Sequence, residues 1–184
     1  AGSHTITVNY KLVSVPTYSN LLFEDFGNGD ENVESPGASP NFCFETQLGT
    51  GSCNSNPALY YGEYTVTNTL HPTSWHEWNP FPKDHSGDKN GKGRFFVTDV
   101  GTVIKPNDVC YKKTIKDIIP NRPIEVEIWV RNLFAIGTSN SPDPNLILDL
   151  EPLGGSLATA LSQQETAPVP RTNDWVHYKL TLNP

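Results

Sequence analysis

Oxygen-bearing side chains gather in residues 84–99, which read D-H-S-G-D-K-N-G-K-G-R-F-F-V-T-D. Asp84, Asp88 and Asn90 offer hard oxygen ligands, and the glycines among them leave the backbone free to curl around an ion. This composition indicates a calcium loop, but it is equally typical of an ordinary polar hairpin turn. The spacing differs from the twelve-residue helix–loop–helix calcium pattern, because no Glu closes the loop and no helix flanks it.

A single tryptophan stands among charged side chains in the longest alternating segment, residues 124–131. Alternation puts the aliphatic residues on one face and Glu125, Glu127, Trp129 and Arg131 on the other. An indole there would offer a flat apolar platform to a sugar ring, with charged groups beside it for the hydroxyls. The alternative is that a crossing loop buries the indole as a second small core.

Two further tryptophans, Trp75 and Trp78, lie in a segment that contains several prolines and ends at Pro82. They either close one end of a β-sandwich or extend a stacking surface for sugar rings. The sequence is compatible with both interpretations.

A hydrolase is the weaker alternative to a binding protein. Glu125 and Glu127 are roughly 7 Å apart along one strand, a separation that suits a glycosidase carboxylate pair. Glycosidase carboxylates flank the bond that they cleave, however, whereas neighbours on one strand approach a substrate from the same side. The order of residues shows no Ser-His-Asp or Cys-His arrangement, and the five histidines lack zinc-site spacing. We therefore expect no enzymatic activity.

The three cysteines predict one disulfide. Cys43 and Cys53 bracket a short Gly/Ser-rich segment whose ends a bridge could join. Cys110 lies in an apolar run and is expected to keep its thiol, packed as a small hydrophobe. A disulfide indicates an oxidising compartment, so we expect a secreted or cell-surface protein.

Composition and charge narrow the class of protein further. The net charge of −7 and the absence of clustered Lys and Arg argue against a nucleic-acid partner. No apolar stretch reaches the roughly 20 residues that a membrane-spanning helix needs, so we expect no membrane insertion. Residues 1–4, Ala-Gly-Ser-His, look like a tag remnant. Residues 5–184 are then expected to form one module, excised from a larger protein, monomeric in isolation and adjoining neighbouring domains in the parent.

The elements that must hold these residues are β-strands. Sixteen Pro and 14 Gly are typical of short strands joined by turns, with little helix. Residues 32–57 are expected to form a long surface loop without chemistry. Strands are predicted at residues 5–15, 59–67, 94–98, 124–131, 145–152 and 175–182. A short apolar strand that ends in acids and glycines is also predicted within residues 21–30, and another strand is predicted to start within residues 106–115. Together they predict an all-β, two-sheet antiparallel sandwich of the jelly-roll type with long surface loops.

Several motifs follow one another over residues 18–184: F-E-D-F-G-N-G-D, G-E-Y-T-V-T-N, D-H-S-G-D-K-N-G, Y-K-K-T-I, I-E-V-E-I-W-V-R-N-L and W-V-H-Y-K-L-T-L. In order and spacing they resemble a jelly-roll module found in very large secreted and cell-surface proteins of gliding bacteria. More distantly, they are similar to MAM domains and to calcium-dependent carbohydrate-binding modules of galactose-binding-like fold.

The resemblance implies a Ca²⁺ ion at one edge of the sandwich, where acids of the first strand and the Asp-His loop meet the last strand. Carried over residue by residue, it marks as oxygen donors Asp25, Asp84, Asp174, Asp30, Asp88 and Asn90. Glu24 could replace Asp25, because a shift of one residue decides which acid faces the ion.

The function expected from residues and resemblance together is a non-catalytic, calcium-dependent carbohydrate-binding module of a secreted adhesin-type protein involved in cell adhesion. Its ligand-binding residues would be Trp129, Glu127, Arg131, Trp78 and Trp75, and its partner a polysaccharide or cell-surface glycan. A structural spacer that binds no glycan is the alternative, and a glycoside hydrolase-like enzyme is a lesser one.

Overall fold

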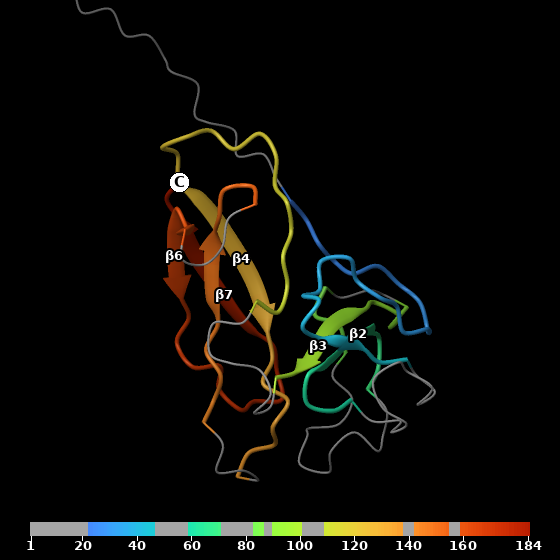
Figure 1. Ribbon diagram of the computed structural model, residues 1–184. Helices are drawn as coiled ribbons and strands as arrows, with labels where there is room; N and C mark the ends of the chain where they lie inside the picture. The colour runs from blue at the N-terminus through green and yellow to red at the C-terminus, as the bar shows by residue number, and fades with distance from the viewer. Residues whose placement is uncertain are drawn as a thin grey trace, which may run out of the picture.

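The computed structural model (Figure 1) shows a mostly-β chain. It describes residues 22–46, 59–70, 83–86, 90–100, 109–137, 142–154 and 159–184. These contain seven β-strands and no α-helix, which confirms the predicted all-β class. The tag-like residues 1–4, the strand predicted at 5–15, and Cys53, Trp75, Trp78 and Asp88 lie outside the described residues.

The first sheet has the strand order β1-β2-β3. Its strands are β1 (Cys43–Phe44), β2 (Glu63–Thr67) and β3 (Phe95–Asp99). β1 runs parallel to β2, and β3 runs antiparallel to it, with Thr65 opposite Val97. Since β1 falls within residues 32–57, the prediction of a loop throughout that segment is wrong: backbone pairing with β2 makes part of it a short edge strand.

The second sheet pairs β4 (Ile124–Val130) with β7 (Val176–Leu182) in antiparallel register, with Trp129 opposite His177. Burial alternates along both strands, so the aliphatic side chains of β4 face inward while its other face stays exposed. This confirms the two-faced strand that alternation predicts.

The third sheet pairs β5 (Ile147–Leu150) with β6 (Ser162–Glu165), again antiparallel. Figure 1 shows β4, β6 and β7 together on one side of the molecule, with β2 and β3 on the other. The fold is thus an all-β arrangement of several small sheets. No helix long and apolar enough to cross a bilayer occurs in the part of the chain that the structure describes.

One cluster of buried apolar side chains lies on one face of the first sheet. Phe95 and Val97 of β3 pack there with Leu59 and Leu70, and Trp175 covers their side. The ring of Phe95 meets the Trp175 indole edge to face at 5.8 Å. Because Trp175 directly precedes β7, this aromatic contact joins the first sheet to the second.

Candidate functional site

The outer face of β4 and β7 carries an exposed row of polar and aromatic side chains. From β4 come Glu125, Glu127 and Trp129, all exposed. Antiparallel register places His177 and Lys179 of β7 directly opposite Trp129 and Glu127. Side chains opposite each other on one face of a sheet are close enough to interact, so these five residues form one surface, called here the β4–β7 face.

Ion pairs organise the charged half of this face. Lys179 Nζ lies 3.0 Å from Glu125 Oε2 and 3.5 Å from Glu127 Oε1. His177 Nε2 lies 3.4 Å from Glu127 Oε2. The hydrogen bond and charge of Glu125 raise the pKa of Lys179, with Glu127 adding to the effect. The two carboxylates therefore share one ammonium group. A pair of catalytic carboxylates would instead be free to contact the substrate.

Two imidazole rings stack on the indole of Trp129. His177 stacks with ring centroids 4.5 Å apart and planes 15° apart, and His85 stacks at 4.4 Å and 28°. Trp129 is nevertheless 44% exposed. Burial lowers the pKa of His85; the Asp84 charge opposes this and His177 adds to it, so the neutral ring is favoured. The indole thus stacks with two neighbouring rings, while part of its surface stays open.

The segment that carries His85 is anchored to the sheet by Trp175. The Trp175 indole Nε1 donates a hydrogen bond of 2.7 Å to the Lys83 carbonyl oxygen, and its ring lies 6.0 Å from that of His85. Sequence reasoning did not select His85, His177 or Trp175 as site residues. The signal for His177 was its outward position in the last strand, but its meeting with Trp129 depends on which strands pair.

Arg131, which was expected on the same binding face, lies just past the end of β4 and is half-buried. Burial lowers its pKa, partly offset by the charge of Asp174. Among the described residues its buried Nε has no hydrogen-bond partner. The Arg131 guanidinium is therefore less accessible to a ligand than the alternating sequence pattern predicts.

The acids expected to bind calcium have other partners. Asp30 forms an ion pair of 2.6 Å with Lys92 and accepts a hydrogen bond of 3.2 Å from the Asn68 amide. The Lys92 hydrogen bond lowers the Asp30 pKa. An ammonium group this close already supplies the positive charge that a cation would bring.

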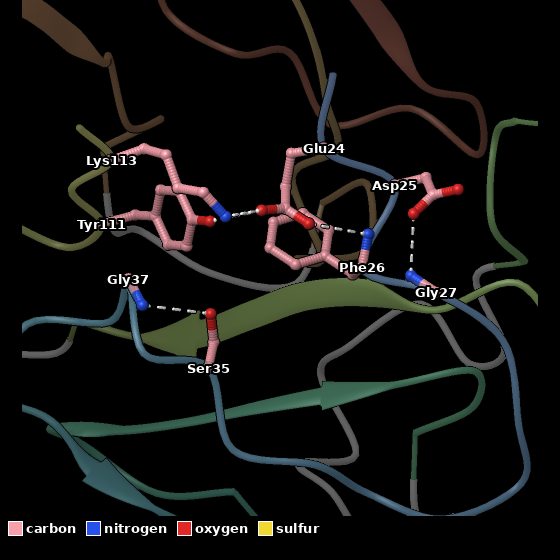
Figure 2. Close-up of polar contacts among 8 residues, drawn as sticks. All are labelled: Glu24, Asp25, Phe26, Gly27, Ser35, Gly37, Tyr111 and Lys113. Carbon is pink, nitrogen blue, oxygen red and sulfur yellow. Dashed lines mark hydrogen bonds and ion pairs between the residues drawn. The ribbon is translucent and has the colours of Figure 1, made fainter. Parts of the chain in front are cut away.

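Glu24 and Asp25 point apart (Figure 2). The Glu24 carboxylate accepts hydrogen bonds from the Tyr111 hydroxyl at 2.9 Å, from the Phe26 amide at 3.3 Å and from the Lys113 ammonium. Asp25 Oδ1 accepts a local hydrogen bond of 3.0 Å from the Gly27 amide. Glu24 therefore connects its segment to residues 111–113 through side-chain contacts, whereas Asp25 makes a hydrogen bond within its own turn.

Two further predicted donors, Asp84 and Asp174, make local hydrogen bonds. Asp84 Oδ2 accepts from the Ser86 amide at 3.1 Å and from its hydroxyl, and a Cβ on Gly93 would collide with it. The Asp174 amide donates to Thr172 Oγ1 at 3.3 Å. No group of three or more His, Cys, Asp or Glu side chains that could hold a metal occurs among the described residues. Asp88 lies outside the described residues, and calcium binding by the predicted donors stays a prediction.

Cys43 is disulfide-bonded, and Cys110 keeps its thiol. The predicted partner, Cys53, lies outside the described residues, so the pairing itself stays a prediction.

Comparisons with models of protein families, with curated proteins and with solved structures each returned no match.

Proposed function

We propose that this chain is a non-catalytic carbohydrate-binding module of jelly-roll fold, from a secreted or cell-surface adhesin-type protein, and that it binds glycans on the β4–β7 face. The observation that carries the proposal is Trp129, which is 44% exposed and lies at one end of a row of hydrogen-bonding side chains. Sugar-binding surfaces combine an aromatic wall with a few well-placed polar groups, and this face has both.

The aromatic stacks favour a pre-formed site. Because His177 and His85 both stack on Trp129, the indole loses little freedom when a ligand arrives. A side chain that is already ordered adds less entropic cost to binding. The open part of the indole would contact the apolar C–H groups of a sugar, while Glu127 and Lys179 beside it could bond to hydroxyls.

The ion pairs support a binding role over a hydrolytic one. A glycosidase needs one carboxylic acid with a raised pKa and one free carboxylate, on opposite sides of the bond. Here Lys179 bridges Glu125 and Glu127 on one face of one strand. Both carboxylates therefore contact the same ammonium group and approach a ligand from the same side, which differs from the flanking pair of a glycosidase.

A spacer domain without glycan binding is the second candidate. The two imidazole rings favour it, because they cover part of the indole surface that a sugar would use. Calcium dependence is a separate part of the proposal and rests on the composition of residues 84–91, since the described acids do not form a cage.

A glycan array tests the proposal, with the wild type compared with Trp129→Ala in calcium and in chelator. Tyr61→Ala is the matched control, because Tyr61 is 42% exposed and lies next to the other sheet. We expect Trp129→Ala to lose the glycan signal and Tyr61→Ala to keep it. Full burial would make the truncation cost about 3–5 kcal/mol, and the observed exposure reduces this to about 1.5–3 kcal/mol. No bound glycan for the wild type, or equal binding by Trp129→Ala, would favour the spacer.

A further inference from the structure

Two acidic side chains are buried in the first sheet, away from the β4–β7 face. Glu45 is 2% exposed and Glu63 is 3% exposed. The Glu45 amide donates to the Tyr64 carbonyl at 2.9 Å, which continues the parallel β1–β2 ladder and sets Glu45 beside Thr65. Glu63 lies two residues from Thr65 on the same strand, so all three side chains share one face.

Oxygen atoms on this face lack hydrogen-bond donors. Within the described chain, neither carboxylate oxygen of Glu45 has a partner, and neither does Thr65 Oγ1, although Thr65 is only 4% exposed. Glu63 Oε2 accepts a hydrogen bond of 2.7 Å from the Tyr60 amide. Buried polar atoms are nearly always satisfied in native proteins, so unsatisfied oxygens on one face point to a missing positive partner.

The electrostatics agree with this geometry. Burial, and then the charge of Glu63, raise the pKa of Glu45 to about 7. No described lysine, arginine or histidine forms an ion pair with Glu45. An isolated buried carboxylate is costly unless a proton or a cation neutralises it.

We propose that Glu45, Glu63 and Thr65 bind one hard divalent cation of the calcium class. The donors are all oxygens, two of them carboxylates and one a hydroxyl, which suits Ca²⁺ and not the softer metals that prefer sulfur or imidazole. Calcium takes about 6–8 oxygen ligands in flexible geometry, so backbone carbonyls or water would complete the shell.

The site is distinct from the calcium loop that the sequence suggests at Asp84. Its ligands come from β2 and from the residue that follows β1, so the cation would join the edge strand to the centre of the sheet. The disulfide at Cys43 holds the same edge strand covalently. A cation here would therefore strengthen the same region, without taking part in glycan binding.

Calorimetric titration with CaCl₂, and melting curves with and without it, test the site in three proteins: wild type, Glu45→Gln and Asp84→Asn. We expect the wild type and Asp84→Asn to bind one Ca²⁺ and to melt about 5–11 °C higher at calcium 100-fold above Kd. Glu45→Gln should lose affinity at least tenfold. In chelator it should melt no lower than the wild type, because it loses a buried charge.

Thr65→Val is the second variant, since it keeps the shape of the side chain and removes only the hydroxyl oxygen. We expect it to fold and to bind Ca²⁺ more weakly than the wild type, so the proposal stays testable if Glu45→Gln does not fold. The proposed site would be wrong if Thr65→Val and Glu45→Gln both bound calcium with unchanged affinity. It would also be wrong if only Asp84→Asn lost calcium binding. Absence of calcium binding by the wild type would also overturn it, and would mean that a proton neutralises Glu45. The glycan array with Trp129→Ala is independent of all these outcomes.

Discussion

Replacing Glu24 by Gln should destabilise the fold, because the Glu24 carboxylate accepts hydrogen bonds from two donors far along the chain, Tyr111 and Lys113, as well as from the nearby Phe26 amide (Figure 2). Glu24 and Lys113 side chains are 27% and 38% exposed, so solvent screening limits their ion pair to about 1 kcal/mol. Gln can still accept the Tyr111 hydrogen bond, but as a neutral group it loses about 0.5–1.5 kcal/mol. The expected total is about 1.5–2.5 kcal/mol, or about 3–10 °C in melting temperature.

Asp25→Asn is the matched control, because the two acids are neighbours with opposite roles. Asn keeps an oxygen for the Gly27 amide, so this change should stay within about 0.5 kcal/mol of the wild type. Urea unfolding at pH 7 measures both variants. Equal stability of Glu24→Gln and Asp25→Asn would refute the structural role of Glu24.

The pH dependence provides a second check on Glu24. Burial raises its pKa, but hydrogen bonds from Lys113, Tyr111 and Phe26 outweigh this and lower it from 4.5. A lowered pKa means that the stabilisation is present above pH 4.5 and is lost as the pH falls through the folded-state pKa. The stability difference between the wild type and Glu24→Gln should therefore shrink in acid. A stability difference between the two proteins that stays constant as the pH falls well below 4.5 would contradict this reasoning.

Two further predictions concern His85 and Cys43. Because burial lowers the His85 pKa from 6.5, the unfolded chain binds more protons just below that pH, so acidification from pH 7.5 to 5 should lower the melting temperature more in the wild type than in His85→Gln. Equal shifts would show that His85 is not held neutral. Mass spectrometry of the unreduced, digested protein should find Cys43 joined to Cys53; a bridge to Cys110 instead would contradict the predicted pairing.

Local alternation predicted the strands that position the candidate face. β4 and β7 both keep strict alternation, so the faces of Glu127, Trp129 and His177 follow from the residues alone. The pairing of β4 with β7 could not be predicted in the same way, since it joins segments that are far apart in the chain. For that reason the stack of Trp129 and His177 was missed, although alternation along each strand puts both side chains on the outer face.

Other contacts depend on tertiary structure that the sequence pattern does not encode. Asp30 was expected to face an ion, but it pairs with Lys92, which is 62 residues away. Glu45 lies in a polar segment where a surface loop was expected, and acids are seldom fully buried. Its burial depends on a two-residue edge strand, which is too short to produce a recognisable alternation.

The glycan that gives the strongest array signal provides the most direct test of the proposed function. Adding it to ¹⁵N-labelled protein should shift the indole N–H resonance of Trp129, assigned with Trp129→Phe, together with the backbone amides of His177 and Lys179. Resonances of β2 should stay in place, because the first sheet lies outside the proposed face. Shifts confined to other parts of the chain, with the Trp129 resonance unchanged, would contradict glycan binding on the β4–β7 face.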